Sequence, residues 1–572
     1  MSYKKNLFLF LILSISLLNA QGSLLLVGGG RENYNKWSDQ PYSWFVEQAD
    51  SGKIINIDTD SASAWYPDYF KSFGASSESK NIQIATESAA KDSSIYRELS
   101  SASGIFMEGG NQWEYVNTWQ GTLVEAAIHE VFNNGGVIGG TSAGLAVLGE
   151  ICFDARNGSA YPEETAKNAW DPNISLTDDF LEILPDVLTD SHFHPRGRLG
   201  RLVPMMAQRI SHHHDQKLMG IGVDDKTALC IAPDMKAKCY GKGSVTILYQ
   251  SDDSEIISEN KRPVKFTNLN FEQLVHGMEY NLAKKDPINP EKYLQPVDYT
   301  PQTRDYLDTT INGSDAESAQ LGEIEIKGLT SNDLNAWYGD LSIAAGEKMV
   351  PGTVIIPRLW YDGNYNAGPN FFFFFIIDGL YGVTKNSVFK AIYLDPECTT
   401  HVSSDGILEI NGYGIILETR DMQYVGFPQK QQEDAPIRNS NHPGMIGAKI
   451  HFIRQGDRYD LQNHKTNIES ENGNQPEDFK LYNCYPNPFN PETKITYSLP
   501  ESGLVNLEIY NLIGKKVTTL VNEEQNASIH NYSWDGSDKS GNRLSSGVYF
   551  LRLAASINGN QYRASRKVLL VK

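Results

Sequence analysis

Cysteine is scarce in this sequence. The 572 residues include five cysteines, an odd number spread from Cys152 to Cys484, and no two of them form a C-x-x-C pair. This distribution excludes a disulfide framework and gives no cysteine-based metal site. Cys230 and Cys239 could pair if they lie on adjacent strands, but buried free thiols are an equally good expectation.

Positive charge is also in short supply. Lysine and arginine total 50 against 70 aspartates and glutamates, which gives a formal net charge of −20. Such a balance argues against nucleic acid as the main partner. It is compatible with a cationic substrate, and equally with a role in solubility alone.

Long apolar runs are absent outside the N-terminus. Residues 7–18 are apolar apart from two serines, they follow Lys4-Lys5, and Asn19-Ala20 comes next. This pattern predicts a secretory signal peptide, residues 1–20, cleaved after Ala20. An uncleaved anchor is the alternative, although the run is short for a membrane span. We therefore expect a soluble, exported mature protein.

Short apolar segments alternate with helical patterns after the signal peptide. Strands are expected at residues 24–27, 53–58, 81–85 and 104–108, and helices at about 67–73 and 113–132. This alternation predicts an α/β fold with a mostly parallel sheet covered on both faces. Gly28-Gly29-Gly30 follows the first strand, but Asn33 breaks the G-x-G-x-x-G pattern, so no dinucleotide or other cofactor is predicted.

The most informative stretch is Gly140-Thr141-Ser142-Ala143-Gly144, which fits G-x-S-x-G. An apolar strand, Val137-Ile138, precedes it, and helix-favouring residues 145–148 follow. This context predicts a nucleophile elbow with Ser142 at its tip. The N–H groups of Ala143 and Gly110 are then candidates for an oxyanion hole. The alternative is an ordinary glycine-rich turn between strand and helix.

A serine nucleophile needs a base, and residues 189–202 are the richest source of one. They contain His192 and His194, with three arginines that could bind carboxylates. The carboxylate that orients the histidine could be Asp224 or Asp225, after an apolar strand. Residues 212–215, His-His-His-Asp, are interpreted as a solvated helix face, because consecutive helical side chains point in different directions. No metal site is predicted.

Together these motifs resemble the cyanophycinase and aspartyl dipeptidase family of serine peptidases, in order and spacing, over about residues 23–285. The resemblance implies a flavodoxin-like sheet, similar to class I glutamine amidotransferases. It also implies a triad of Ser142, His192 and Asp225. The residues that match the family's substrate pocket are Gln112, Asp190, Ser191, Arg196, Arg198 and Arg201.

Two positions depart from the family pattern. Ser191 replaces a glutamine, and Asp225 replaces a glutamate that is one methylene longer. The resemblance implies hydrolysis of cyanophycin, a poly-aspartate that carries arginine on its β-carboxyls, to β-Asp-Arg dipeptides. Other aspartyl or isoaspartyl peptides are alternatives, as is a non-catalytic surface binding protein on the same scaffold. The family also allows a homodimer.

Residues 286–465 form a β-rich region without a second G-x-S-x-G. Residues 269–271 and 277–282 are echoed by 450–452 and 456–461, and residues 222–224 by 393–395. We interpret the region as a degenerate partial repeat of the peptidase domain, with an unrelated β-rich insert as the alternative. Residues 466–480, rich in Asn, Glu, Gly and Pro, predict a linker.

Short alternating strands separated by Gly, Asn and Asp turns fill residues 481–572, which predicts a small β-sandwich. Tyr485-Pro486-Asn487-Pro488-Phe489, Trp534-Asp535-Gly536 and residues 567–572 resemble the C-terminal sorting domain of the type IX secretion system. That resemblance implies the secretion machinery as a partner, with the product secreted or held at the outer cell surface. A carbohydrate-binding sandwich is the alternative.

Overall fold

The structure is a computed structural model. It describes residues 22–60, 64–213, 218–297, 304–312, 314, 316–327, 342–345, 347–357, 390–419, 421–426, 444–463, 465–466, 479–481, 484, 489–512, 514–539, 541–557 and 560–571. Two compact units divide the chain, Met1–Thr466 and Asn467–Lys572. The expected signal peptide lies outside the described residues, as does most of the expected linker.

The first sheet has the order β16-β15-β11-β10-β1-β5-β4-β2-β3, and its strands from β1 to β3 are parallel. The mostly parallel α/β fold that the sequence predicts is therefore confirmed. The bounds are β1 Ser23–Val27, β2 Ile54–Asp58, β3 Lys80–Gln83, β4 Gly104–Met107, β5 Val137–Thr141, β10 Thr227–Ile231, β11 Lys236–Gly241, β15 Glu279–Asn281 and β16 Asp286–Ile288. The expected boundary between residues 285 and 286 falls within the β15–β16 hairpin.

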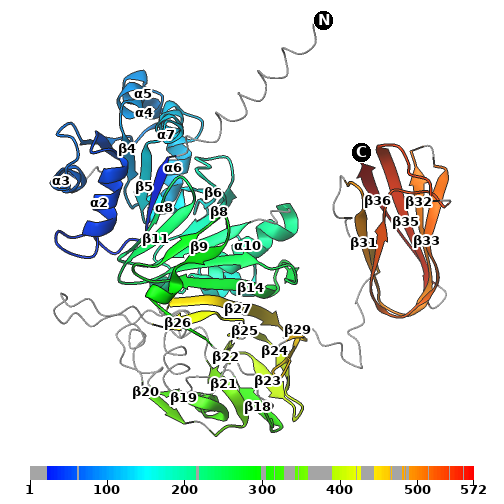
Figure 1. Ribbon diagram of the computed structural model, residues 1–572. Helices are drawn as coiled ribbons and strands as arrows, with labels where there is room; N and C mark the ends of the chain where they lie inside the picture. Colours follow the sequence, from blue (N-terminus) through cyan, green and yellow to red (C-terminus); the bar gives the residue numbers. More distant parts are fainter. Residues whose placement is uncertain are drawn as a thin grey trace, which may run out of the picture. The chain divides into compact units, whose positions relative to one another are not determined.

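Helices cover both faces of this sheet (Figure 1). Alternate residues of β1 enter different cores, Leu24 and Leu26 on one face and Leu25 and Val27 on the other. Helices α2 and α3 pack into the core that contains Leu25 and Val27, and helices α5 to α7 pack into the core that contains Leu24 and Leu26. The bounds are α2 Asp39–Gln48, α3 Trp65–Ser72, α4 Glu87–Ala90, α5 Ser93–Ser100, α6 Gln112–Trp119, α7 Leu123–Asn133 and α8 Ala143–Ala146.

One helix expectation was wrong. The single helix over 113–132 is two helices, α6 and α7, because Gly121 between them has a φ of 68° that ends the first. The helix after the elbow, α8, is a single turn, because the chain enters β6 at Gly149.

A second sheet begins with the strands β7-β6-β8-β9-β12-β14. Strands β6, β8 and β9 run parallel, and β12 and β14 continue the sheet antiparallel. The bounds are β6 Gly149–Phe153, β7 Leu176–Thr177, β8 Leu184–Asp190, β9 Met219–Val223, β12 Val245–Gln250, β13 Ile256–Ile257 and β14 Lys265–Leu274. Helices α9 Pro162–Lys167 and α10 Leu199–His213 and the short η1 His194–Arg196 lie within this stretch of the chain.

The same sheet then continues into the β-rich region with the mirror-image order β27-β25-β22-β21-β19-β20. Each pairing repeats the direction of its counterpart: β21 and β22 are parallel like β8 and β9, and β19 and β20 antiparallel like β6 and β7. The bounds are β19 Gly322–Lys327, β20 Ser342–Ala345, β21 Val350–Ile356, β22 Lys390–Leu394, β25 Tyr413–Glu418, β26 Tyr424–Gly426 and β27 Gly444–Arg454.

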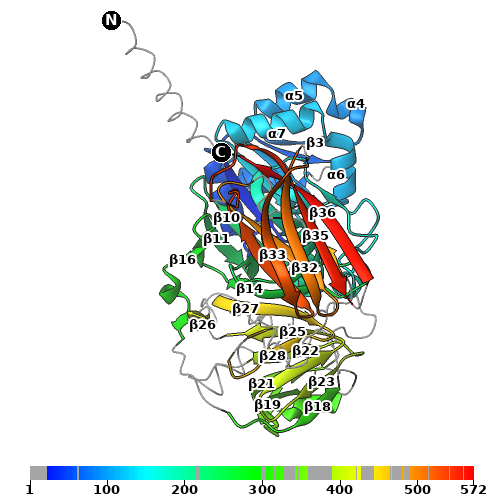
Figure 2. The ribbon, with the colours of Figure 1, turned by 90° about the vertical axis from the view of Figure 1, so that its right-hand side faces the viewer.

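The two halves meet at β14 and β27, which pair antiparallel with Leu269 opposite Ile450. In Figures 1 and 2, β14 in green lies beside β27 in yellow. These strands contain two of the segments that echo each other in the sequence, 269–271 and 450–452. The two halves are therefore related by a pseudo-two-fold axis within one chain.

A smaller sheet, β18-β23-β24-β28-β29, repeats the pairing of β1-β10-β11-β15-β16. Its bounds are β18 Thr309–Asn312, β23 Thr399–Val402, β24 Ile407–Asn411, β28 Arg458–Asp460 and β29 Lys465–Thr466. The remaining short elements of this region are η2 Pro290–Lys292, β17 Gln295–Pro296 and η3 Ala316–Leu321. Only residues 313–321 separate β18 from β19, whereas residues 28–148 separate β1 from β6. The second half thus has no room for a counterpart of the elbow.

One hydrophobic core joins the halves, since Phe266, Leu269 and Phe271 belong to the same buried cluster as Ile450 and Phe452. Lys265 also forms an ion pair of 3.1 Å with Asp457, and both side chains are largely buried. The β-rich region is therefore an integral part of the first unit.

Five cysteines are free and buried. Strands β10 and β11 are adjacent, but Cys230 lies opposite Lys238 and Cys239 opposite Leu229. This one-residue offset sends the two thiols into different cores, so they cannot pair.

The second unit is a β-sandwich, as the sequence predicts. Its sheets are β30-β31-β34 and β33-β32-β35-β36, the latter visible in Figure 2. Ile495 and Trp534 of one sheet and Leu507 and Leu551 of the other share a core. The bounds are β30 Lys480–Leu481, β31 Thr493–Leu499, β32 Gly503–Asn511, β33 Lys516–Gln525, β34 Ser528–Trp534, β35 Gly547–Ile557 and β36 Asn560–Leu570. Among all described residues, no helix is long and apolar enough to cross a membrane.

Candidate active site

Ser142 stands at the tip of a sharp turn between β5 and α8. Its φ of 54° and ψ of −108° are strained for a residue with a side chain. The flanking glycines are required by contact: a Cβ on Gly140 would lie 2.3 Å from backbone atoms of Gly144, and one on Gly144 would lie 2.3 Å from the Met107 carbonyl oxygen. The sequence therefore folds into an elbow that presents a serine hydroxyl.

His192 faces this hydroxyl. Its Nε2 lies 2.8 Å from the Ser142 Oγ. The residue follows β8 in a left-handed conformation with φ of 46°, and its backbone N–H donates to the Gly28 carbonyl at 2.9 Å. The loop after β8 thus brings the imidazole to the carboxyl end of β1 and β5.

Asp225 completes the line of side chains, because its Oδ1 hydrogen bonds with the Nδ1 of His192. The carboxylate reaches despite the shorter side chain. Gly29 and Gly30 permit this approach: a Cβ on Gly29 would lie 2.3 Å from the His192 ring, and one on Gly30 would lie 2.9 Å from the Asp225 Cβ. The Lys226 N–H donates to the Gly29 carbonyl at 2.7 Å and fixes the two loops together.

The environment of His192 favours the neutral imidazole. Burial is the largest cause that lowers its pKa below the ordinary value, and the cations Arg196 and Arg198 lower it further. The hydrogen bond and charge of Asp225 act in the opposite direction but do not outweigh these effects. A neutral imidazole at Nε2 can accept the proton of the serine hydroxyl.

Asp224, the alternative orienting carboxylate, has different partners. It is fully buried, and its Oδ1 accepts the backbone N–H of His194 at 2.9 Å and lies 2.6 Å from the His194 Nδ1. Its Oδ2 accepts the N–H and hydroxyl of Ser244 at 2.7 and 2.9 Å. This network ties the loop that carries His192 to β9 and β12.

The glycine loop expected to supply part of an oxyanion hole lies beside the nucleophile. A Cβ on Gly109 would be 3.2 Å from the Ser142 Cβ, so backbone approaches the serine closely. The Gly144 N–H donates to the Glu108 carbonyl at 3.0 Å and holds this loop against the elbow. Gly110 belongs to the same loop, and Ala143 follows Ser142 directly.

Asp190 is an internal anchor for two of the three arginines. The Arg201 guanidinium binds it in bidentate fashion at 2.7 and 2.5 Å, and Arg198 binds it at 3.0 Å. Burial by itself raises the pKa of Asp190, but the charges of Arg201 and Arg198 hold the pKa below its ordinary value. The carboxylate therefore stays ionised and fixes both cations.

The remaining expected pocket residues differ in exposure. Arg201 is buried and its guanidinium lies 4.8 Å over the Phe153 ring, whereas Arg196 and Arg198 are half-buried. Ser191 is buried and its hydroxyl accepts a hydrogen bond of 3.3 Å from Arg198. Arg196 and Arg198 are thus better placed than Arg201 to meet a ligand.

Gln112 begins α6 and is half-buried. Its side-chain amide donates to the Phe153 carbonyl at 3.2 Å. Because Arg201 packs on the same Phe153, both expected pocket residues are held by one residue of β6.

Glu32 was missed in the sequence because no motif contains it. Its carboxylate accepts hydrogen bonds from the hydroxyls of Tyr42 at 2.9 Å, Tyr66 at 3.1 Å and Thr141 at 3.2 Å. Thr141 precedes the nucleophile, so Glu32 links the loop after β1 to the elbow. Only the folded chain reveals this contact, since 109 residues separate the partners.

Only part of the histidine-rich segment lies within the described ranges. The His212 ring packs edge-on against Trp170 at 4.5 Å, while residues 214–215 lie outside those ranges. No group of three or more His, Cys, Asp or Glu residues there could hold a metal ion.

Comparison with known proteins shows two matching families. The model of peptidase family S51 matches residues 24–238, and that of the FlgD Ig-like domain matches residues 490–559. The cyanophycinase of Synechococcus elongatus is 35% identical over 276 residues, which are 46% of this chain and 80% of that protein. The cyanophycinase of Geminocystis herdmanii is 28% identical over 231 residues, 39% of this chain and 78% of that protein. A solved peptidase from an acI-B1 Actinobacterium is 20% identical with a TM-score of 0.31, and the match covers 47% of this chain and 99% of that one.

Proposed function

The chain belongs to peptidase family S51, and on this premise we propose that it is an exported serine peptidase that hydrolyses cyanophycin. The observation that carries the proposal is the pair of hydrogen bonds that links the Ser142 hydroxyl to His192 and His192 to Asp225. Relatives named cyanophycinase support the substrate class. Other aspartyl or isoaspartyl peptides are the alternative substrates.

In the proposed reaction, the Ser142 Oγ attacks the scissile carbonyl carbon while the Nε2 of His192 accepts the hydroxyl proton. The N–H groups of Ala143 and of the Gly109-Gly110 loop would stabilise the negative oxygen that forms. The C–N bond then breaks, and His192 gives its proton to the leaving amine. Water, activated by His192, releases the acyl group and restores the serine.

The arginines give the pocket its proposed preference. Arg196 and Arg198 would bind the free α-carboxylates of the arginines attached to the polyaspartate, because guanidinium groups pair with carboxylates in bidentate fashion. Asp190 would act through Arg198 by fixing its position, and it also holds Arg201. The expected products are β-Asp-Arg dipeptides.

The test compares wild type with Ser142→Ala on purified cyanophycin, with dipeptide release followed by mass spectrometry. We expect release by the wild type and none by the variant. Cleavage of isoaspartyl peptides but not cyanophycin would correct the substrate. Binding of cyanophycin by both proteins without cleavage would instead support a non-catalytic binding protein.

We also propose export through a signal peptide at residues 1–20 and a sorting role for the second unit in type IX secretion. The match to an Ig-like domain and the independent core of the sandwich support a separate module there. Residues 467–572 fused to a periplasmic reporter should carry it to the cell surface or medium in a host with that machinery. Retention of the reporter in the periplasm would contradict the sorting role.

A further inference from the structure

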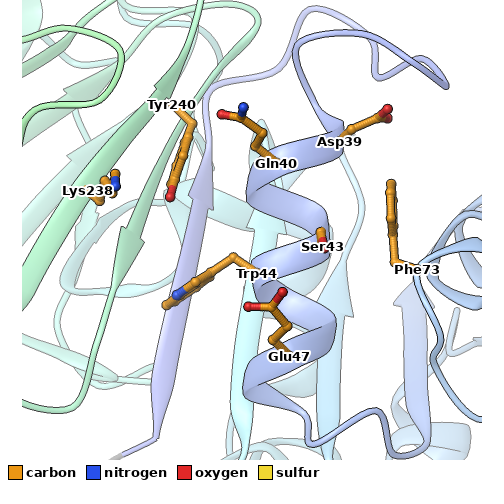
Figure 3. A pocket seen from close by; sticks show the side chains of 8 residues that line it. All are labelled: Asp39, Gln40, Ser43, Trp44, Glu47, Phe73, Lys238 and Tyr240. Atoms are coloured by element: carbon orange, nitrogen blue, oxygen red, sulfur yellow. The ribbon is translucent and has the colours of Figure 1, made fainter.

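A hollow of about 560 Å³ lies on the outer side of α2 and is not part of the triad. Figure 3 shows Trp44 extending from α2 toward β11, which carries Tyr240 and Lys238, while Phe73 lies on the other side of the helix. The aromatic side chains are half-buried, so each keeps part of its ring accessible. The side chains that line the hollow include Asp39, Trp44, Glu47, Phe73, Lys238 and Tyr240.

An aromatic run leads from this hollow to the loop that follows β1. The Phe73 ring lies 4.8 Å from that of Tyr69, and Tyr69 stacks on Trp65 at 4.3 Å. Tyr34 meets both Trp65 and Tyr69, at 5.4 and 4.9 Å, and is 44% exposed. Because Tyr34 follows the Gly29-Gly30 segment that contacts His192 and Asp225, the run connects the hollow to the loop beside the candidate triad.

Negative charge accompanies the rings. Asp39 accepts the Tyr69 hydroxyl at 2.8 Å, and Glu47 is exposed at the hollow. The cation Lys238 lies 5.5 Å over the Tyr240 ring, but its charge is offset by Glu279 at 3.2 Å. The surface therefore combines aromatic faces with two carboxylates, and Tyr240 already accepts a cation over its face.

We propose that this surface binds the guanidinium side chains of an arginine-bearing polymer and holds the substrate beyond the residue being cleaved. A guanidinium is flat enough to stack on aromatic rings and pairs with a carboxylate in bidentate fashion. The inference rests on the proposed function, because cyanophycin carries an arginine on every aspartate. The hollow alone is large enough for one arginine side chain of the polymer. The aromatic run offers contacts to further arginines of the same polymer.

The kinetic test compares Trp44→Ala and Glu47→Gln with wild type on polymeric cyanophycin and on the shortest cleavable fragment. We expect the ratio of the polymer KM to the fragment KM to rise about five- to tenfold in each variant, the size of a lost cation–π or charge contact. Phe550→Ala, in the second unit, and Glu78→Gln, at an exposed site, are the matched controls and should leave the ratio unchanged. An unchanged ratio in both hollow variants, on an active enzyme, overturns this inference and leaves the proposed function intact.

A binding test separates the two proposals if the wild type does not cleave cyanophycin. In the Ser142→Ala background, tetra-arginine should quench the tryptophan fluorescence of the protein, and replacement of Trp44 by alanine should reduce this quenching. Glu47→Gln should weaken the binding of tetra-arginine about five- to tenfold. Equal binding of tetra-arginine with and without Glu47→Gln overturns the inference. Binding of a neutral oligosaccharide in preference to tetra-arginine also overturns it, because stacked rings and carboxylates can hold sugars as well.

Discussion

Two neighbouring carboxylates, Asp224 and Asp225, have different partners although they are adjacent in the chain. Asp225 contacts the imidazole that faces the nucleophile, and its side chain is 30% exposed. Asp224 is fully buried and holds His194 and Ser244. Adjacent positions in the chain therefore hold a carboxylate that contacts His192 and one that anchors the loop carrying it.

Substitution of Asp224 by alanine should destabilise the first unit by about 3–5 kcal/mol, because it removes the buried acceptor of His194 and of two Ser244 donors. The midpoint of urea unfolding measures this loss. Asp225→Ala is the matched control and should cost less than about 1 kcal/mol, since its side chain is partly exposed. Similar losses in both variants would contradict the assignment.

Asp225→Asn should lower kcat by about three to four orders of magnitude, because an amide can no longer orient and stabilise the His192 imidazolium. Unfolding midpoints of variant and wild type should agree. A kcat within tenfold of wild type would show that another group orients His192.

The pH profile should report the lowered pKa of His192. The base must be neutral, so the acid limb of kcat/KM, which reports the free enzyme, is expected below the ordinary pKa of about 6.5. Arg196→Gln removes a cation that lowers this pKa, so the limb should move to higher pH. A limb that stays in place, or moves to lower pH, would mean that Arg196 does not act on His192.

At the scale of elements, the elbow is a contact between backbones. Strand β5, the turn at Ser142 and helix α8 come together only because Gly140 and Gly144 carry no side chain, and the Gly109 loop approaches from β4. The close contacts of Gly140, Gly144 and the Gly109 loop thus hold the backbone of Ser142 in its strained conformation.

Gly144→Ala should prevent correct assembly of the elbow, since its Cβ would lie 2.3 Å from a rigid carbonyl oxygen. We expect loss of activity and a lower melting temperature of the first unit. Gly547→Ala in β35 is the control, because the nearest atom to its Cβ is 4.0 Å away. Wild-type activity in Gly144→Ala would show that the loop from β4 can shift.

At the scale of the whole molecule, the first unit repeats its own architecture about the β14–β27 pair. The second half repeats the strands that flank this pair in the first half, and its described residues contain no counterpart of the elbow at Ser142. It covers the edge of β14, which would otherwise expose unpaired backbone groups and an apolar core. A homodimer, which the family resemblance allows, would need a different surface.

Truncation after Ile288 should therefore produce a protein that aggregates or associates through β14. A chain that ends at Thr466 should not associate through this edge, and light scattering distinguishes the two. A soluble, monomeric 1–288 fragment would mean that the second half is dispensable for covering this edge.

The sequence by itself determined the alternation that makes a parallel sheet, the elbow around Ser142 and the β-sandwich after residue 480. These follow from local preferences: apolar periodicity, glycine placement and turn residues act over a few neighbours. The echoes between 269–271 and 450–452 also pointed to a repeat, but not to the pairing of those strands with each other.

Only the tertiary structure decided which carboxylate meets His192, that Asp190 binds Arg198 and Arg201 internally, and that Glu32 contacts Thr141. It also decided that Gly121 divides one expected helix into two, and that Cys230 and Cys239 face different cores. Each outcome depends on register, on side-chain reach or on a close approach between distant segments. The distances between these distant segments are set when the strands pack, so no local sequence pattern predicts them.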